Sequence, residues 1–496
     1  MPNIELSVVG KQILFSPSFF YRFDPKQWKD QKPYPPYGTI YAASLLRANG
    51  YGVQLFDTHL KQSPAEIKPV LKTSSPGYLV IYDDGFNYLT KMCLSAMRSA
   101  AFELIRYGKS EDWIVIVCNS DASDHYDLYL KEGADFVILG EGELTLLELM
   151  QSLEKNQRDH SHIRGLAYRT ADHNICTIKR PVLKDLDTLP DPAWDLVDIE
   201  AYRSIWQDAH GFFSLNLATT RGCPFKCNWC AKPIYGNRYN SRSPKRVVQE
   251  IISLQNLYGA SHLWMADDIF GLNPKWVEEF RQELLASSIR IKFKIQSRAD
   301  LLIQENYIKS LVDAGVDEVW IGAESGSQKI LDAMDKGTTI HQIEKATKLL
   351  HEQEVSVGFF LQFGYPGEGI TEIKETIAML LRVMPEDIGI SVSYPLPGTL
   401  FYDRVKHQLQ SKQNWTDSDD LDMMYAAAYS PAFYKQLHRF VHKIFRLKQG
   451  WNNLGAVIKG RRKITWSALK SIAAMVYYLP AVTADRLKLR RLYTPV

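Results

Sequence analysis

Three cysteines fall within eight positions of the segment RGCPFKCNWCAKP, residues 221–233. Cys223, Cys227 and Cys230 have the spacing C-x3-C-x2-C, which gathers three potential thiolate ligands in one short loop. The remaining cysteines lie far from this loop and from one another, so a disulfide framework is not expected. They are Cys93, Cys118 and Cys176.

Two kinds of metal site favour thiolates. A structural zinc ion needs four ligands, commonly two C-x2-C pairs, and the sequence offers no second pair. An iron–sulfur cubane held by only three cysteines keeps one iron open for a substrate or cofactor. The three-cysteine spacing therefore predicts a reactive [4Fe–4S] cluster.

The elements that position this loop follow two β/α series. In the first 150 residues, apolar runs such as QILFSPSF, YLVIYDD and WIVIVCNS alternate with helix-like segments, including PPYGTIYAASLLRANG and a helix from about Leu89 to Tyr107. Buried β-rich runs separated by helices are typical of a doubly wound parallel sheet, whose ligands bind at the carboxyl ends of the strands. The first domain is therefore predicted to be Rossmann-like.

The second series starts at SLNLATT (214–220) after a stretch rich in Pro and Asp that we interpret as a linker. It repeats at roughly 30-residue intervals with six predicted strands, which suits a partial (β/α)6 barrel with its chemistry at the C-terminal strand ends. The later strands are SHLWMADD, RIKFKIQSR, VDEVWIGAES, VSVGFFLQFG and DIGISVSYPL.

The cysteine loop, with Trp229 just before its last cysteine, resembles that of the radical S-adenosylmethionine (SAM) superfamily. In that family the open iron chelates SAM, one electron cleaves the sulfonium to a 5′-deoxyadenosyl radical, and the aromatic residue contacts the adenine. The resemblance thus implies cluster ligation by Cys223, Cys227 and Cys230 and a SAM contact for Trp229.

Strand-end motifs extend this resemblance. It implies that Asp267 and Asp268 hold the amino end of SAM, with helix capping as the alternative. It also implies a ribose contact for Glu324 and Ser325, with simple turn chemistry as the alternative. FGYPGE (363–368) and YPLPGT (394–399) look like loops that close over SAM and substrate.

A Rossmann-like domain before such a barrel is similar to the cobalamin (B12)-binding class of the superfamily, and residues 415–446 look like the C-terminal region of anaerobic Mg-protoporphyrin monomethyl ester cyclase. The class implies that one loop binds the corrin, and the alternative is that this loop is an ordinary strand-to-helix turn. Its residues are Gly140, Glu141, Gly142 and Glu143.

This sequence departs from the motif D-x-H-x-x-G, which supplies an axial histidine in many cobalamin proteins. Its nearest string, residues 57–62, lacks the glycine and follows the second strand. Cobalamin is then expected to bind without a protein imidazole, with His59 on a surface or in a loop. A domain that keeps the fold without the cofactor remains the alternative.

We therefore predict an α/β chain: a doubly wound cobalamin-binding domain (1–180), a linker (181–208), a partial radical SAM barrel (209–405) and a C-terminal helical, basic region (406–496). From Pro431 onward there are 14 Lys and Arg residues and one acid, although the whole chain carries only +3. This region is expected either to pack as a helical subdomain or to lie on an anionic membrane. The apolar stretch 467–482 is too short to span a bilayer.

The sequence shows no signal peptide and few cysteines, so we expect a cytoplasmic enzyme, peripheral at the inner membrane surface if its tail binds lipid. The leading hypothesis is cobalamin-dependent C-methylation of an unactivated carbon in a small, lipophilic substrate, with a flavodoxin- or ferredoxin-type electron donor and no nucleic acid. Radical oxidation or cyclisation without methylation is the alternative within the superfamily. A tRNA methylthiotransferase is disfavoured, because it would need three more clustered cysteines and Cys93, Cys118 and Cys176 are scattered. A non-enzymatic carrier is a further alternative, and it would not turn over SAM.

Overall fold

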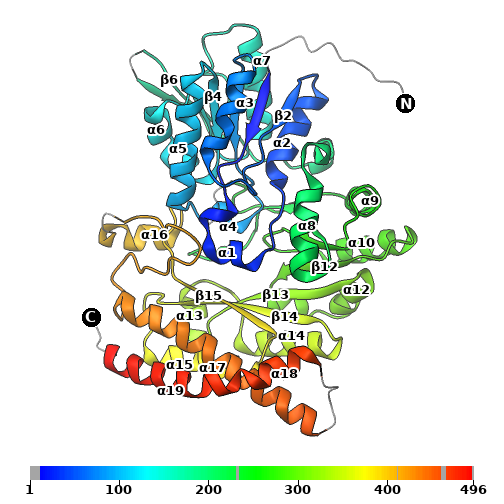
Figure 1. Ribbon diagram of the computed structural model, residues 1–496, viewed down its shortest axis with the longest axis vertical. Coiled ribbons are helices and arrows are strands. Elements are labelled where there is room, and N and C mark those ends of the chain that lie inside the picture. The colour runs from blue at the N-terminus through cyan, green and yellow to red at the C-terminus, as the bar shows by residue number, and fades with distance from the viewer. Residues whose placement is uncertain (1–11, 172, 231–233, 410–411, 460–464, 494–496) are drawn as a thin grey trace. The chain divides into compact units, whose positions relative to one another are not determined.

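The computed structural model describes residues 12–171, 173–230, 234–409, 412–459 and 465–493 (Figure 1). The chain separates into two compact units. The first comprises Met1–Pro224, Ala231–Phe293 and Asn414–Asp420, and the second comprises Phe225–Cys230, Lys294–Gln413 and Leu421–Val496. The predicted domain boundaries stay a prediction, and the two units are taken in turn.

The first unit begins with a seven-stranded sheet of order β2-β1-β3-β4-β5-β6-β7. The first five strands pair in parallel, which confirms the predicted doubly wound sheet, and β6 and β7 extend its edge as an antiparallel hairpin. The strands are β1 Ile13–Ser16, β2 Val53–Leu55, β3 Tyr78–Tyr82, β4 Ile114–Cys118, β5 Phe136–Ile138, β6 Leu166–Arg169 and β7 Asn174–Cys176.

Alternating side chains of this sheet build one core on each face. Ile13 and Phe15 of β1 belong to a core with residues of α2 and α7, and Leu14 belongs to the opposite core with residues of α3, α5 and α6. The helices are η1 Tyr21–Phe23, α1 Pro25–Asp30, α2 Tyr37–Ala48, η2 Pro64–Ile67, α3 Lys68–Thr73, α4 Tyr88–Lys91, α5 Ser95–Ser110, α6 Ser120–Glu132 and α7 Glu143–Glu154.

The helix expected from about Leu89 to Tyr107 is two helices, α4 and α5. Cys93 lies between them with a left-handed φ of 54°, and an α-helix cannot continue through that conformation. The prediction of one helix was wrong at this point because the apolar spacing continues across the break.

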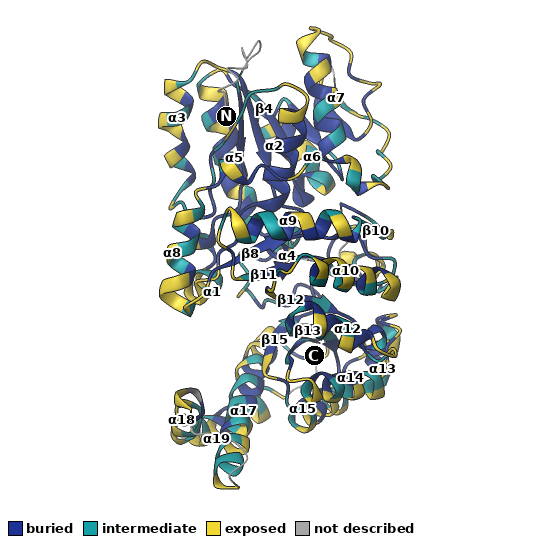
Figure 2. Ribbon diagram, turned by 90° about the vertical axis from the view of Figure 1, so that its right-hand side faces the viewer, coloured by how far each residue is buried: buried dark blue, intermediate teal, exposed yellow. Residues whose placement is uncertain are grey.

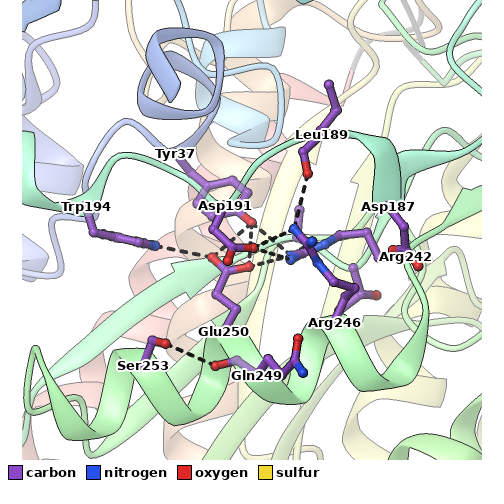
Figure 3. Close-up of polar contacts among 12 residues, drawn as sticks. Tyr37, Asp187, Leu189, Asp191, Trp194, Arg242, Arg246, Gln249, Glu250 and Ser253 are labelled. Atoms are coloured by element: carbon purple, nitrogen blue, oxygen red, sulfur yellow. Dashed lines mark hydrogen bonds and ion pairs between the residues drawn. The ribbon is translucent and has the colours of Figure 1, made fainter. Parts of the chain in front are cut away.

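The stretch interpreted as a linker contains the helices η3 Leu186–Thr188, η4 Trp194–Leu196 and α8 Ile199–His210. Its residues are fixed to α9, Pro244–Asn256, by polar contacts (Figure 3). The buried carboxylate of Glu250 accepts hydrogen bonds from Trp194 Nε1 and Tyr37 Oη at 3.2 Å and pairs with Arg242 at 2.5 Å. This network ties the linker, α2 and α9 together within the first unit.

The strand–helix series begins in the first unit. β8 and β11 pair in parallel, and the Ser243 side chain caps α9 by accepting a hydrogen bond from the Arg246 N–H. Residues 292 and 293 of β12 belong to the first unit and the rest of that strand to the second. The elements are β8 Ser214–Leu217, β9 Thr220–Arg221, β10 Asn240–Ser241, α9, β11 His262–Met265, α10 Pro274–Ala286 and β12 Lys292–Ser297.

The second unit continues the series, with β13, β14 and β15 in one parallel array. All six predicted strands are therefore present along the chain, each followed by at least one helix. The further elements are α11 Ala299–Leu302, α12 Tyr307–Ala314, β13 Val316–Glu324, α13 Gln328–Ala333, α14 Ile340–Glu352, β14 Ser356–Phe363, α15 Ile370–Val383, β15 Asp387–Val392, α16 Leu400–Val405 and η5 Lys406–Gln408.

Three helices end the chain: α17 Pro431–Ile458, α18 Trp466–Ala473 and α19 Met475–Leu492. Gly450 lets α17 approach the next segment closely, because a Cβ there would lie 2.4 Å from Met475 Cγ. Among the described residues, no helix has both the length and the apolar character needed to cross a membrane.

Candidate active site

Arg221, the residue that opens the cysteine loop, is held by two carboxylates that follow β5: Glu141 in the loop and Glu143 at the start of α7. Its guanidinium pairs with Glu141 at 2.5 Å and with Glu143 at 2.7 Å, and all three side chains are at most 7% exposed. Burial would lower the pKa of Arg221, but the charges of Glu143 and Glu141 outweigh it and raise the pKa. Residues 140–143, predicted to bind corrin, are thus tied by ion pairs to Arg221, which lies two residues before Cys223.

Aromatic rings complete the enclosure of Arg221. Its guanidinium carbon lies between 5.3 and 5.5 Å from three ring centroids, a range in which the ring faces attract a cation. These rings belong to Tyr41, Phe86 and Tyr235. Sequence reasoning missed Arg221, since its partners lie 78 and 80 positions away.

Gly142 fills a tight position in the same loop. A Cβ at this residue would lie 2.5 Å from Cys118 Sγ and 2.8 Å from Tyr82 Oη, closer than real Cβ contacts. Gly140 has a left-handed φ of 80°. These constraints suit a tight strand-to-helix turn, and a role of residues 140–143 toward corrin stays a prediction.

Gly142→Ala is expected to lower the free energy of unfolding by about 1–3 kcal/mol, because overpacking forces neighbouring atoms apart. Adding Cys118→Ala removes the nearest atom and is expected to restore part of the loss. Gly455→Ala is the control, since nothing lies within 4 Å of a Cβ there and alanine favours its helix. Urea unfolding measures all four proteins, and equal stabilities for Gly142→Ala and Gly455→Ala would contradict the packing argument.

Asp267 fixes the strand end that leads into the cysteine loop. It accepts hydrogen bonds from the backbone N–H groups and hydroxyls of Thr219 and Thr220 at 2.6–2.9 Å. Burial raises its pKa to about 6. Asp268 pairs with Lys91 at 2.6 Å, and Asn273 caps the following helix. A contact of either aspartate with SAM stays a prediction.

His59 lies in the loop after β2, one of its two expected positions, but it is not on the surface, because its side chain is fully buried. Nδ1 lies 2.8 Å from the Tyr34 carbonyl oxygen, and the rings of Phe19 and Tyr21 meet the imidazole edge-on. Its Nε2 has no hydrogen-bond partner among the described residues, and the same holds for Oδ2 of the buried Asp84. Both residues follow strands of the N-terminal sheet at their carboxyl ends.

In the second unit, Asn228 fastens the middle of the cysteine loop. Its side chain donates to the Ala333 carbonyl at 2.8 Å and to Asp335 at 2.7 Å, and it accepts a 2.6 Å hydrogen bond from Tyr365 Oη. Its carbonyl also accepts from the Phe401 N–H. Asn228 therefore connects the loop to the segments after β13, β14 and β15, a role without a sequence signal.

Lys336 links two predicted SAM residues, Trp229 and Glu324. Its ammonium pairs with Glu324 at 2.8 Å and lies 5.9 Å from the Trp229 ring centroid. Burial alone would lower the pKa of Lys336, but the charges of Glu324 and Cys227 outweigh it and raise the pKa. The buried Trp229 Nε1 has no partner among the described residues, so it can still donate to a ligand.

Ser325 lies in the turn that starts α13. Its hydroxyl accepts from the Ser327 N–H at 3.1 Å and lies 3.1 Å from Thr376 Oγ1. Gly326 is required beside it, since a Cβ there would lie 2.5 Å from the Thr376 backbone. This geometry agrees with turn chemistry, and a ribose contact of Ser325 stays a prediction.

Glu368, in the FGYPGE loop, is a buried carboxyl that accepts a hydrogen bond from the Gly364 N–H. Burial raises its pKa to about 8. The group is therefore mostly protonated at neutral pH. Its Oε1 has no partner among the described residues.

Glu368→Gln is expected to change how stability depends on pH. Between about pH 4.5 and 8 the folded state keeps a proton that the unfolded state has released, so the free energy of unfolding falls as pH rises, by up to ~1.4 kcal/mol per pH unit. Glutamine keeps the acceptor for Gly364 and removes this slope. Urea unfolding from pH 5 to 8 measures it, with the exposed Glu375→Gln as control. Parallel curves for wild type and Glu368→Gln would contradict the argument.

The three thiols divide between the units: Cys223 in the first, and Cys227 and Cys230 in the second. Cys223 is buried and the other two are partly exposed. Within the described parts of the chain, no three His, Cys, Asp or Glu side chains converge as they would around a metal ion. Cluster ligation by these cysteines stays a prediction from their spacing.

A family model described as the radical SAM superfamily matches residues 217–380, from the end of β8 into α15. These residues form a radical SAM domain. The chain is therefore an enzyme with a radical SAM domain, and such a domain uses SAM and a [4Fe–4S] cluster. Radical SAM enzymes of this kind act on a small-molecule substrate and need an electron donor.

Relatives of the radical SAM chain differ in their named activities. It is 27% identical over 399 residues to an uncharacterized methyltransferase of Pyrococcus horikoshii, covering 78% of this chain and 82% of the relative. It is 28% identical over 282 residues to the anaerobic magnesium-protoporphyrin IX monomethyl ester cyclase of Cereibacter sphaeroides, covering 56% of this chain and 45% of the cyclase. The chain thus spans less than half the length of that cyclase.

The fold of the radical SAM chain resembles that of a solved enzyme. The radical SAM methyltransferase TsrM from Kitasatospora setae, solved with cobalamin and a [4Fe–4S] cluster, superposes with a TM-score of 0.67 at 18% identity. The match covers 86% of this chain and 85% of TsrM. It confirms the predicted fold class, a Rossmann-like domain followed by a radical SAM barrel and a C-terminal region.

Proposed function

We propose that this enzyme transfers a methyl group to an unactivated carbon, with cobalamin bound at the carboxyl ends of the N-terminal sheet. The sequence likeness to a methyltransferase over 78% of the chain supports methyl transfer. The fold shared with TsrM supports the pairing of a cobalamin domain with a radical SAM domain.

One observation carries the proposal: the buried ion pairs of Arg221 with Glu141 and Glu143. They join the loop after β5, at the carboxyl end of a parallel sheet, to the residue that precedes Gly222 and Cys223. Ligands of such sheets bind at this end. A corrin held there would lie beside the start of the cluster loop, as methyl delivery to a carbon radical requires.

The residues at this end of the sheet fit a polar ligand. The unpartnered Nε2 of His59 and Oδ2 of Asp84 are buried, and such atoms are costly unless a ligand or water satisfies them. Gly140 leaves room at its Cβ position, where only one backbone oxygen lies within 4 Å. We propose that His59, Asp84 and Gly140 line the corrin site.

The chain's own residues have separate tasks in this proposal. When bound, the reduced cluster supplies an electron to SAM and the methylated corrin supplies the methyl group. Arg221 holds the start of the cysteine loop and Asn228 holds its middle, and Lys336 places a positive charge beside Cys227. Trp229 Nε1 and Glu324 face SAM, and the loop that carries Glu368 helps to exclude water.

The proposed substrate is small and lipophilic, the electron donor is a flavodoxin or ferredoxin, and the enzyme works in the cytoplasm with its basic C-terminal region on the membrane. The last 66 residues carry 14 Lys and Arg residues and one acid, which favours an anionic surface. Radical oxidation or cyclisation is the second candidate, supported by the likeness to the ester cyclase over 56% of the chain.

Methyl-deuterated SAM tests the proposal directly. Reconstituted enzyme with cobalamin, dithionite and labelled SAM is expected to place the deuterated methyl group on the corrin, detected by mass spectrometry. An oxidase or cyclase of this architecture would release 5′-deoxyadenosine without labelling the corrin. A cobalamin-free sample is the control, and an unlabelled corrin beside active SAM cleavage would overturn methyl transfer.

A further inference from the structure

Three helices of the second unit border a long apolar groove. α17 packs against both α15 and α19 (Figure 1). Side chains of the three helices line a groove of about 660 Å³. This volume lies within the range of about 300–1,000 Å³ that small-molecule sites span. The apolar walls include Ile373, Ile377, Leu381, Leu437, Phe440 and Leu489.

The lining residues form one stripe on each helix. On α15 they recur three or four positions apart, from Ile370 to Leu381, and on α17 from Phe433 to Ile444. Side chains at this spacing share one helix face, so the stripes run along the helices and the groove is elongated. Ile377, Leu381 and Leu489 remain partly exposed along it, as a surface that buries a chain-like apolar ligand would.

Three cations stand at this groove: Lys374, Arg486 and Arg490. All three are exposed, and none has a carboxylate partner among the described residues. Other cations of these helices are paired, for example Lys443 with Asp485 at 2.7 Å. The groove therefore combines an apolar floor with uncompensated positive charge.

The C-terminal helices are also amphipathic beyond the groove. Nine of the fifteen exposed large apolar side chains of the described residues lie between Trp451 and Tyr493, although this is a short part of the chain. Figure 2 shows α18 and α19 mostly in the colours of exposed and intermediate residues. Exposed apolar residues beside many cations are typical of a helix surface that lies on anionic lipid. The nine are Trp451, Ile458, Trp466, Leu469, Val476, Tyr477, Leu479, Leu487 and Tyr493.

We propose that the groove of α15, α17 and α19 binds one acyl chain of an anionic phospholipid, whose phosphate pairs with Lys374, Arg486 and Arg490. The lipid is thereby held by the enzyme while its neighbours remain in the bilayer. This proposal goes beyond a general attraction of a basic tail to anionic lipid, because it assigns a binding site for the acyl chain and three cations that bind the phosphate together. It does not depend on methyl transfer.

Flotation of the full-length, cluster-loaded enzyme with vesicles tests the charge recognition. Wild type is expected to float with phosphatidylglycerol–phosphatidylcholine vesicles and not with phosphatidylcholine alone. Arg486→Gln and Arg490→Gln are each expected to lower the partition coefficient about fivefold. Lys488→Gln is the matched control, since Lys488 is exposed on the same helix and does not line the groove. An equal loss for Lys488→Gln would overturn the proposal in favour of unspecific attraction.

Filling the groove tests the acyl-chain site without changing charge. Ala378 lines the groove, and Ala378→Phe is expected to lower vesicle binding at least tenfold, whereas Ala432→Phe, exposed on α17 outside the groove, leaves it unchanged. Native mass spectrometry after incubation with phosphatidylglycerol should show one bound lipid on wild type and none on Ala378→Phe. Unchanged binding by Ala378→Phe would overturn the proposal.

Two other occupants of the groove, free phosphate and a second copy of the chain, would each give a different experimental result. If inorganic phosphate alone removed the difference between wild type and the arginine variants, the cations would form a free phosphate site and the lipid proposal would fail. If wild type formed dimers without vesicles and Ala378→Phe did not, the groove would be an interface between copies. None of these measurements uses SAM turnover, so their failure leaves the methyl-transfer proposal to its own test.

Discussion

Arg221→Met is expected to lower the free energy of unfolding by about 3–5 kcal/mol and to reduce the iron content after reconstitution. The guanidinium is 4% exposed and pairs with Glu141 and Glu143, whose side chains are nearly as buried. Removing it leaves two carboxylates close together without a positive charge, and breaking buried ion pairs in this way is strongly destabilising. Urea unfolding and iron analysis measure the two effects. Iron is expected to fall because Arg221 lies two residues before Cys223.

The matched control is Arg246→Met. Arg246 pairs with Asp191 at 2.7 Å, but both side chains are substantially exposed, and exposed pairs contribute about 0–1 kcal/mol. A second test combines Arg221→Met with Glu141→Gln and Glu143→Gln, which removes the uncompensated charges and should recover much of the stability. If Arg221→Met and Arg246→Met cost the same, the buried triad would not hold the cysteine loop.

The sequence was sufficient for elements with a local pattern. Each of the six strands predicted from SLNLATT to DIGISVSYPL contains the observed strand, because each is a short β-rich run that ends at polar or glycine-containing residues. Ser243 could be recognised as a cap since serine followed by proline is a local signal of a helix start. The hairpin of β6 and β7 was missed, because its strands are only four and three residues long and β7 is largely exposed.

The contacts that shape the candidate site have no such local pattern. Asn228 meets Ala333 and Asp335 across more than a hundred positions, and nothing near it in the sequence marks it as a connection point. His59 was expected on a surface or in a loop because residues 57–62 lack the glycine of the axial-histidine motif. Its burial depends on Tyr34, Phe19 and Tyr21, which only the folded chain brings together.

Residues predicted from motifs acquire partners that the motifs do not contain. Glu324 was recognised from IGAESGS, but its ion pair with Lys336 could not be, since lysines twelve positions away are common. Asp267 was recognised from MADDIFGLN, and its four hydrogen bonds with Thr219 and Thr220 give it a positioning role beside any contact with SAM. Motifs therefore identified the region, and tertiary packing determined what each side chain does there.

Replacing Cys223, Cys227 and Cys230 together with alanine is expected to remove the cluster and all SAM cleavage. Iron should fall from about four atoms per chain to near zero, because a cubane held by three thiolates has no other ligands here. 5′-Deoxyadenosine release under dithionite should fall to background. The fold should persist, since two of the three thiols are partly exposed and alanine leaves no large cavity. Circular dichroism and urea unfolding check this.

Cys176→Ala is the matched control for that variant. Cys176 is exposed at the sheet edge, far along the chain from the cysteine loop, so iron content and SAM cleavage should stay at the wild-type level. Single variants sharpen the result, because two thiolates hold a cubane poorly and each single replacement should already prevent SAM cleavage. Wild-type iron and cleavage in the triple variant would show that the thiol spacing was misread, and the proposed methyl transfer would then lose its source of radicals.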